Sequence, residues 1–291
     1  MKRKPFNIKR FLAWLGIHLN LIILAVIVLY PILWLIGSAL SPIRGTPGAV
    51  TQDSFGIIPI PRALTFDNFR RLFSEHNFTL WYRNSLQIAV INTIGTIIIH
   101  TFMGYVFARL QFKGRKMGLL TIMILNMFPS FLALTAVYAI FLTFGWLNNI
   151  NALALLYIGG GIPGTMWLMR GYMLNIPKSL DEAAYMDGAS KWRVFVSVIF
   201  PLSKPIVFFT GFNAFMGPWM DYIFPRMLIR SSDYHTIALG FMAISNPGDM
   251  NYDITAFTAG ALLIAIPFAI IFFVFQKYFA LGIAAGANKG E

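Results

Sequence analysis

Six long apolar segments, separated by shorter polar stretches, set the hydrophobic pattern of this chain. They cover approximately residues 12–39, 86–108, 117–143, 152–173, 197–220 and 254–279. A helix needs about 20 mostly apolar residues to cross the hydrocarbon core of a bilayer. The pattern therefore predicts an all-α, polytopic membrane protein with six transmembrane helices.

The composition and the placement of charge support this prediction and give it a direction. Of the 291 residues, 57% are hydrophobic and 12% are charged, whereas soluble domains carry about 25% charged residues. If the N-terminus is cytoplasmic, the cytoplasmic segments hold 16 Lys and Arg against 4 acids, and the exterior loops hold 7 of each. Basic residues favour the cytoplasmic side. We therefore expect a multi-pass protein of the cytoplasmic (inner) membrane with both termini in the cytoplasm.

Several classes of chemistry are excluded by what the chain lacks. There is no Cys, so disulfides and thiolate metal sites are excluded. The four His residues show no ligand spacing, and no G-x-x-x-x-G-K-[ST] phosphate loop is present. The net charge of +12 gathers at the ends of apolar runs, which suits the anionic lipid surface rather than nucleic acid. We expect no enzyme activity, no metal and no cofactor in this chain.

The apolar segments contain helix breakers and a few polar side chains. Breakers lie at Pro129, at 159–164, at Pro201 with Pro205, and at Pro267. Such breaks either kink packed helices or line a watery cavity, and four of them together favour a cavity. The polar and aromatic candidates for a substrate path are Asn126, Asn213, Trp219 and Tyr222; ordinary packing is the alternative for each.

The predicted cytoplasmic loop at 175–196 has the strongest local signals. Ser179 and Glu182 have the spacing of a capping box at the start of a helix. Leu180, Ala183 and Ala184 are spaced to form one small, smooth face. Gly188 allows a left-handed helix stop, and Ser190 can cap the next helix. Glu182 then has two compatible roles, as the capping partner and as a contact for another protein.

At this point the chain resembles a known family. The pattern E-A-A-x3-G-x9-I-x-L-P marks the inner-membrane permeases of binding-protein-dependent ABC importers, and Glu182, Ala183, Ala184, Gly188 and Pro201 match it. Valine at 198 and phenylalanine at 200 depart from the pattern but stay apolar. The resemblance covers about 85–280. The tail at 275–290 and the stretch 64–69 are similar to MalG-type subunits of maltose and maltodextrin importers.

The resemblance implies a type I ABC importer permease fold and sugar transport. The implied regions are a first helix with an exterior loop (1–84), a permease core (85–280) and a cytoplasmic tail (281–291). The implied partners are a second, MalF-like permease, an ATPase homodimer that holds ATP and Mg, and an extracytoplasmic sugar-binding protein. The residues implied to couple to the ATPase are Leu180, Glu182, Ala183, Ala184, Asp187 and Gly188. Those implied to reach the binding protein's sugar cleft are Asn246, Pro247, Gly248 and Asp249.

Three alternatives stay open. Within the family, the substrate is a maltodextrin or another sugar. A stand-alone secondary transporter usually carries ionisable residues at mid-membrane, and none lies there in this chain. A membrane-embedded enzyme needs clustered acids or His, but here they are scattered or lie in loops.

Overall fold

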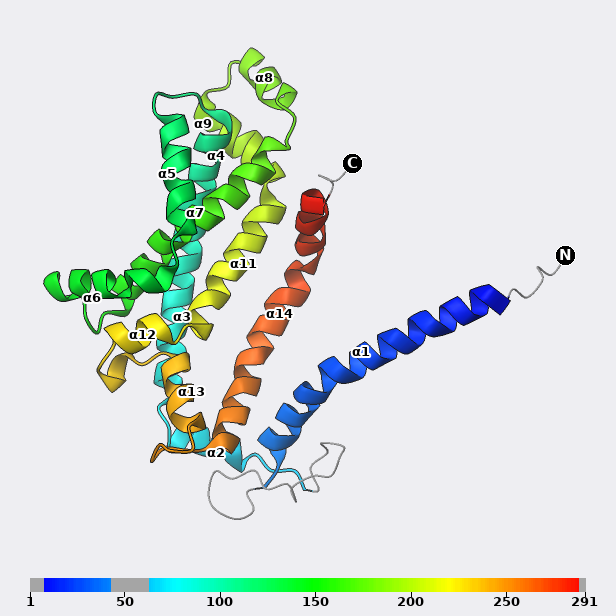
Figure 1. Ribbon diagram of the computed structural model, residues 1–291, viewed down its shortest axis with the longest axis vertical. Coiled ribbons are helices and arrows are strands. Elements are labelled where there is room, and N and C mark those ends of the chain that lie inside the picture. Colours follow the sequence, from blue (N-terminus) through cyan, green and yellow to red (C-terminus); the bar gives the residue numbers. More distant parts are fainter. Residues whose placement is uncertain (1–7, 43–62, 288–291) are drawn as a thin grey trace. The chain divides into compact units, whose positions relative to one another are not determined.

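A computed structural model describes residues 8–42 and 63–287, and within these ranges the chain is helical without strands. This confirms the predicted all-α class. The elements are α1 (Ile8–Leu40), α2 (Asp67–Ser74), α3 (Phe78–Gly95), the π-helical turn η2 (Thr96–His100), α4 (Thr101–Arg109), α5 (Arg115–Met127), the 3-10 turn η3 (Ser130–Ala133), α6 (Leu134–Thr143), α7 (Ile150–Leu174), α8 (Ser179–Met186), α9 (Lys191–Val194), the π-helical turn η4 (Phe195–Ile199), α10 (Phe200–Leu202), α11 (Lys204–Met220), α12 (Ile223–Leu228), the 3-10 turn η5 (Ser232–Tyr234), α13 (Ile237–Ser245) and α14 (Ile254–Ala287) (Figure 1).

Four of the predicted spans are present as single helical segments long and apolar enough to cross a membrane. Among the described residues they are Trp14–Leu40, Phe78–Arg109, Ile150–Leu174 and Ile254–Gln276. The predicted fifth span is a bent pair, because Lys191–Leu202 and Lys204–Met220 meet at 78°. By length and composition, the described residues thus give four continuous spans, or five if the bent pair is one span. The predicted span at 117–143 is the one that does not form a helix of that length.

The predicted third span is divided at Pro129. Helix α5 ends at Met127, and Phe128 is extended, with ψ 124°. A proline disfavours helical backbone in the residue before it and lacks an N–H for the helix ladder, which accounts for the break. The following helix α6 turns away from the direction of α5 (Figure 1). By contrast, Pro163 and Pro267 lie inside the continuous helices α7 and α14.

The chain forms two compact units. The first comprises the described residues up to His76 together with Ala243–Ile266, and the second comprises Asn77–Met242 with the described residues from Pro267. In the first unit, the Asn68 amide donates to the carbonyls of Ala39 and Ser41, both at 2.9 Å, and so ties α2 to the end of α1. Asp253 caps α14 by accepting from the Ala256 N–H at 3.0 Å and is ion-paired with Arg71.

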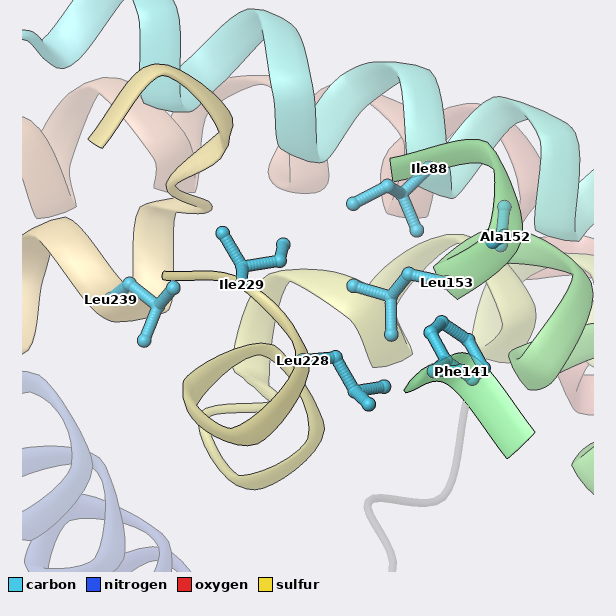
Figure 2. Close-up of a cluster of buried hydrophobic side chains, with 8 residues drawn as sticks. Ile88, Phe141, Ala152, Leu153, Leu228, Ile229 and Leu239 are labelled. Carbon is cyan, nitrogen blue, oxygen red and sulfur yellow. The ribbon is translucent and has the colours of Figure 1, made fainter. Parts of the chain in front are cut away.

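Of the apolar clusters in the second unit, two bear on the site. One gathers side chains from α3, α6, α7, α12 and the segment through α13, and it fixes the divided third span through Phe141 (Figure 2). The other lies where α4, α7, α9 and η4 meet; its buried members are Tyr105, Ala108, Met173, Ile176, Val194, Phe195 and Ile199. This second cluster supports the loop that contains α8.

Candidate functional site: an exposed loop helix and a polar cavity

Helix α8 lies at one end of the second unit and is bounded by well-defined turns (Figure 1). At its C-terminus, Gly188 has φ +77°. The Gly188 N–H donates to the Tyr185 carbonyl at 3.0 Å, and the Ala189 N–H donates to the Ala184 carbonyl at 2.9 Å. This pair of bonds is a Schellman motif, which needs a left-handed residue at that position. The predicted left-handed stop at Gly188 is confirmed.

The two predicted helix caps have different outcomes. The Ser190 hydroxyl accepts from the Arg193 N–H at 3.3 Å, which confirms Ser190 as the cap of α9. The predicted capping box is wrong. Helix α8 already includes Ser179, and Lys178 precedes it with no side-chain cap. The helix begins one residue earlier than predicted, so Ser179 is not at the cap position. The predicted role of Glu182 as the capping partner of Ser179 is therefore wrong as well.

Most of the outward-facing residues of α8 are exposed. Glu182, Ala183 and Asp187 are exposed, Leu180 is 41% exposed and Met186 is 88% exposed. Ala184 is only partly exposed, because it packs against the apolar cluster around Tyr105. The predicted face of Leu180, Ala183 and Ala184 is therefore split, with Ala184 on the inner side. A short helix with exposed carboxylates at 182 and 187, and with the exposed apolar side chains of Leu180 and Met186, is suited to contact with another protein.

The inner side of α8 is held by an ion pair that no sequence motif predicted. Arg109 at the end of α4 places Nε 3.1 Å from Oδ2 of Asp181. Arg109 Nη2 also donates to the Ile176 carbonyl at 2.6 Å. Burial raises the pKa of Asp181, while the Arg109 guanidinium acts in the opposite direction. Arg109 follows an apolar run and Asp181 lies in the predicted loop, but nothing in the spacing of 109 and 181 predicts that they meet.

A polar cavity of about 430 Å³ lies elsewhere in the second unit. Side chains from the α3–η2 segment, α5, α7 and α11 surround it, and none of them is charged. The cavity is lined by Asn92, Thr96, Asn126, Tyr157, Gly160, Gly161, Gly164, Thr165, Leu168, Phe209, Thr210, Asn213 and Ala214. Because glycines of α7 form part of its wall, the run at 159–164 makes room for the cavity without interrupting the helix.

Of the four candidates for a substrate path, the structure brings Asn126 and Asn213 together on this cavity. Trp219 is buried against the rings of Tyr82 and Phe268, at centroid distances of 5.1 and 5.5 Å. Tyr222 packs beside the apolar cluster of Figure 2. Neither aromatic ring lines the cavity, so its polar character comes from amides and hydroxyls.

The cavity wall also holds Asn92 of α3, which was not among the predicted candidates. Its amide donates to the Ala214 carbonyl of α11 at 2.7 Å, whereas its buried Oδ1 has no hydrogen-bond partner among the described residues. The Asn213 amide donates to the carbonyl of Phe209 at 2.8 Å. Uncharged amide oxygens and hydroxyls, together with the Phe209 ring, are groups that bind neutral hydroxylated ligands.

The predicted binding-protein contact is a tight turn in the first unit. The Asp249 N–H donates to the Asn246 carbonyl at 3.0 Å, and the Gly248 N–H donates to Asn246 Oδ1 at 3.2 Å. Pro247 lies between them, and the neighbouring Met250 is fully exposed. The turn is therefore a compact projection rather than an extended loop.

Comparison with known proteins gives the family. Residues 100–284 match the family described as binding-protein-dependent transport system inner membrane component. The chain is 38% identical over 287 residues to the galactooligosaccharides transport system permease protein GanQ of Bacillus subtilis (strain 168), with 98% of each chain covered. It is 40% identical over 284 residues to the maltodextrin transport system permease protein MalD of Streptococcus pneumoniae (strain ATCC BAA-255 / R6), again with 98% of each chain covered.

A solved structure shows the same fold. With a TM-score of 0.76 and 21% identity, the chain is similar to one in the crystal structure of a bacterial ABC transporter involved in the import of the acidic polysaccharide alginate. The likeness covers 95% of this chain and 100% of that chain. It confirms the expected permease fold of ABC importers.

Proposed function

This chain belongs to the family of binding-protein-dependent transport system inner membrane components, and we propose that it is a permease subunit of an ATP-driven oligosaccharide importer. The relatives named above transport galactooligosaccharides and maltodextrins, which supports a sugar oligomer as the substrate class. The chain contains no phosphate loop, so ATP and Mg are held by a separate ATPase homodimer.

The observation that carries this proposal is the construction of α8. Its outward residues are open, and its inward residues are fixed to the membrane bundle by the Arg109–Asp181 pair and the apolar cluster. A helix built in this way transmits displacement as a rigid lever. Glu182, Ala183 and Asp187 are the proposed contacts with the ATPase, and nucleotide-driven closure of the ATPase pair shifts the bundle between its inward- and outward-facing states.

For the substrate we propose a neutral oligosaccharide of the maltodextrin type. The polar cavity has no charged side chain in its wall, which disfavours acidic sugars. Asn126 and Asn213 are the proposed hydrogen-bonding contacts for sugar hydroxyls. A galactooligosaccharide is the second candidate, because it offers the same hydroxyl chemistry and the relative GanQ carries that name.

The topology and the remaining partners complete the proposal. Six crossings place both termini in the cytoplasm, with the third crossing formed by α5 together with the segment after Pro129. A second, MalF-like permease pairs with this chain in the lipid bilayer. An extracytoplasmic sugar-binding protein docks on the side that carries the Asn246–Asp249 turn. The described part of the proposed tail continues helix α14 to Ala287, and residues 288–291 lie outside the described range.

Uptake by the assembled complex tests this function. The chain is co-expressed with its partner permease, ATPase and binding protein, reconstituted into liposomes, and supplied with radiolabelled maltotriose or galactotriose. We expect ATP-dependent uptake that a proton uncoupler does not reduce. Replacement of both Glu182 and Gly188 by other residues is expected to leave ATP hydrolysis but abolish uptake. Uptake that persists without the ATPase and stops with the uncoupler would instead identify a secondary transporter.

A further inference from the structure

The last turn of α4 holds the loop around α8 at three points. Arg109 Nη2 donates to the carbonyl of Ile176, which precedes α8, at 2.6 Å. Arg109 Nε lies 3.1 Å from the carboxylate of Asp181 in the first turn of α8. The Tyr105 hydroxyl, one turn earlier in α4, donates to the carbonyl of Lys191 at 2.8 Å. One helical turn therefore clamps the chain both before and after α8.

The hydrogen bond and the ion pair of Arg109 go to this loop and not to the carbonyls at the end of its own helix. The carbonyl of Phe107 in the last turn of α4 accepts instead from Arg115 at 2.9 Å and from Arg170 at 3.2 Å. The side chains of Arg109 and Asp181 are only 3% and 11% exposed. Theirs is the only ion pair that joins α8 to another helix within the described part of the chain.

A buried ion pair of this kind contributes to position more than to net stability. Desolvation of the two charges offsets most of their attraction, so its removal in favour of uncharged groups is often tolerated. The geometry is nevertheless strict, because the planar guanidinium donates from Nη2 to a carbonyl and at the same time places Nε in ion-pair contact with a carboxylate. A lysine ammonium is a single point charge and does not reproduce that fork. Arg109→Gln and Asp181→Asn each leave one buried charge unpaired and are the harsher changes, whereas Arg109→Lys and the double variant leave no buried charge unpaired.

We infer that Arg109 is a positioning residue that links movement of α8 to the membrane helix α3–η2–α4, with Asp181 as its partner. This inference rests on the proposed transport function, since it requires that an ATPase moves α8. The fork holds the entry to α8 and its first turn as one body with the end of α4. Loss of the fork lets α8 follow the ATPase without carrying the span along, so ATP is hydrolysed with less sugar moved.

The test measures sugar transported per ATP hydrolysed in the reconstituted complete complex. The variants are Arg109→Lys, Arg109→Gln, Asp181→Asn and the double variant Arg109→Gln/Asp181→Asn. Arg83→Lys is the matched control, because Arg83 is an exposed arginine of α3 with no ion pair among the described residues. Amounts of assembled complex are measured for each variant by co-purification of the ATPase.

We expect each single variant to lower the transport-to-hydrolysis ratio of the assembled complex roughly five- to tenfold, and we expect Arg109→Lys and the double variant to assemble near wild type. The double variant is expected to lose no more than the worse single variant, as interacting residues do in a double-mutant cycle. Unchanged ratios, or uptake and hydrolysis that fall together with assembly, would overturn the positioning role. If the unmodified chain neither binds the ATPase nor couples to it, the proposed function itself fails, and that outcome is seen before any Arg109 variant is compared.

Discussion

Replacement of Gly188 by alanine isolates the effect of one backbone angle on α8. Gly188 has φ +77°, and a Cβ built on it meets nothing within 4 Å. The substitution therefore adds no steric overlap with a neighbour. A left-handed conformation costs a residue with a Cβ about 1–2 kcal/mol. We expect no other cost from the substitution. This free energy destabilises the turn that the two hydrogen bonds at the end of α8 close.

The consequence is measurable as local opening. A loss of about 1–2 kcal/mol raises the open population about five- to thirtyfold. The amide hydrogens of Gly188 and Ala189, which bond to the carbonyls of Tyr185 and Ala184, are expected to exchange faster by that factor in Gly188→Ala. Hydrogen–deuterium exchange with the protein in lipid nanodiscs reports it. Gly188→Asn is expected to exchange at an intermediate rate, because asparagine tolerates the left-handed region better than alanine.

A matched glycine provides the control. Gly171 lies inside helix α7, and a Cβ there also meets nothing within 4 Å. Because alanine is the better helix former by roughly 0.5–1 kcal/mol, Gly171→Ala is expected to leave exchange at α8 unchanged. Equal exchange at position 189 in wild type and Gly188→Ala would refute the reasoning, and so would an equal acceleration in the Gly171 control.

Three further predictions concern packing, the first unit and the cavity. In Gly104→Ala, the new Cβ would lie 2.6 Å from Met169 Cβ, where α4 crosses α7. We therefore expect about 1–3 kcal/mol of destabilisation and a lower melting temperature in detergent. Gly159→Ala, with open space around the new Cβ, should melt like wild type, and equal melting temperatures of the two variants would contradict the close crossing. Asp253→Asn removes the buried partner of Arg71 and leaves the exposed Glu75, 3.9 Å away, as its remaining ion-pair partner among the described residues. We expect a loss of about 3 kcal/mol and faster exchange at the Ala256 amide. Asp233→Asn, at an exposed acid, is the control, and a protected Ala256 in Asp253→Asn would show that the ion pair does not hold this turn. Asn213→Ala is expected to raise the half-saturating sugar concentration in uptake assays about three- to tenfold, which corresponds to the free energy of one hydrogen bond. Asn20→Ala is the control, because the Asn20 amide also donates to the carbonyl four residues earlier but lies on α1 outside the cavity. An unchanged value in Asn213→Ala, or the same rise in the control, would remove the cavity from the sugar path.

Much of this architecture follows from local sequence. The long apolar segments predict four of the observed spans, because span length depends only on the thickness of the bilayer. Gly188 and Ser190 were predictable because a left-handed stop and a hydroxyl cap each require a specific residue type. The break at Pro129 was marked in the sequence, but the same residue type stays inside the helix at Pro163 and Pro267. Whether neighbouring helices satisfy the freed backbone groups decides this, and the local sequence does not contain that information.

The site was less predictable because it depends on contacts between distant segments. Arg109 and Asp181 are separated by 72 positions in the chain, yet they form the ion pair beneath α8. Asn126 and Asn213 were candidates by chemistry, and so were Trp219 and Tyr222. The helix packing brings only the two asparagines to the cavity. Residue type indicates what a side chain can bind, while its position across the bundle decides whether it reaches the ligand.

Site-specific crosslinking tests the central claim, that α8 is the surface through which an ATPase drives this membrane protein. The chain contains no Cys, so Met186→Cys on α8 introduces a single reactive thiol at a position that is 88% exposed. In the complete complex in membrane vesicles, we expect that thiol to crosslink to the ATPase subunit, and a thiol from Met250→Cys to crosslink to the binding protein instead. A Met186→Cys thiol that captures no ATPase subunit, or that a membrane-impermeant reagent labels from the exterior, would contradict the account.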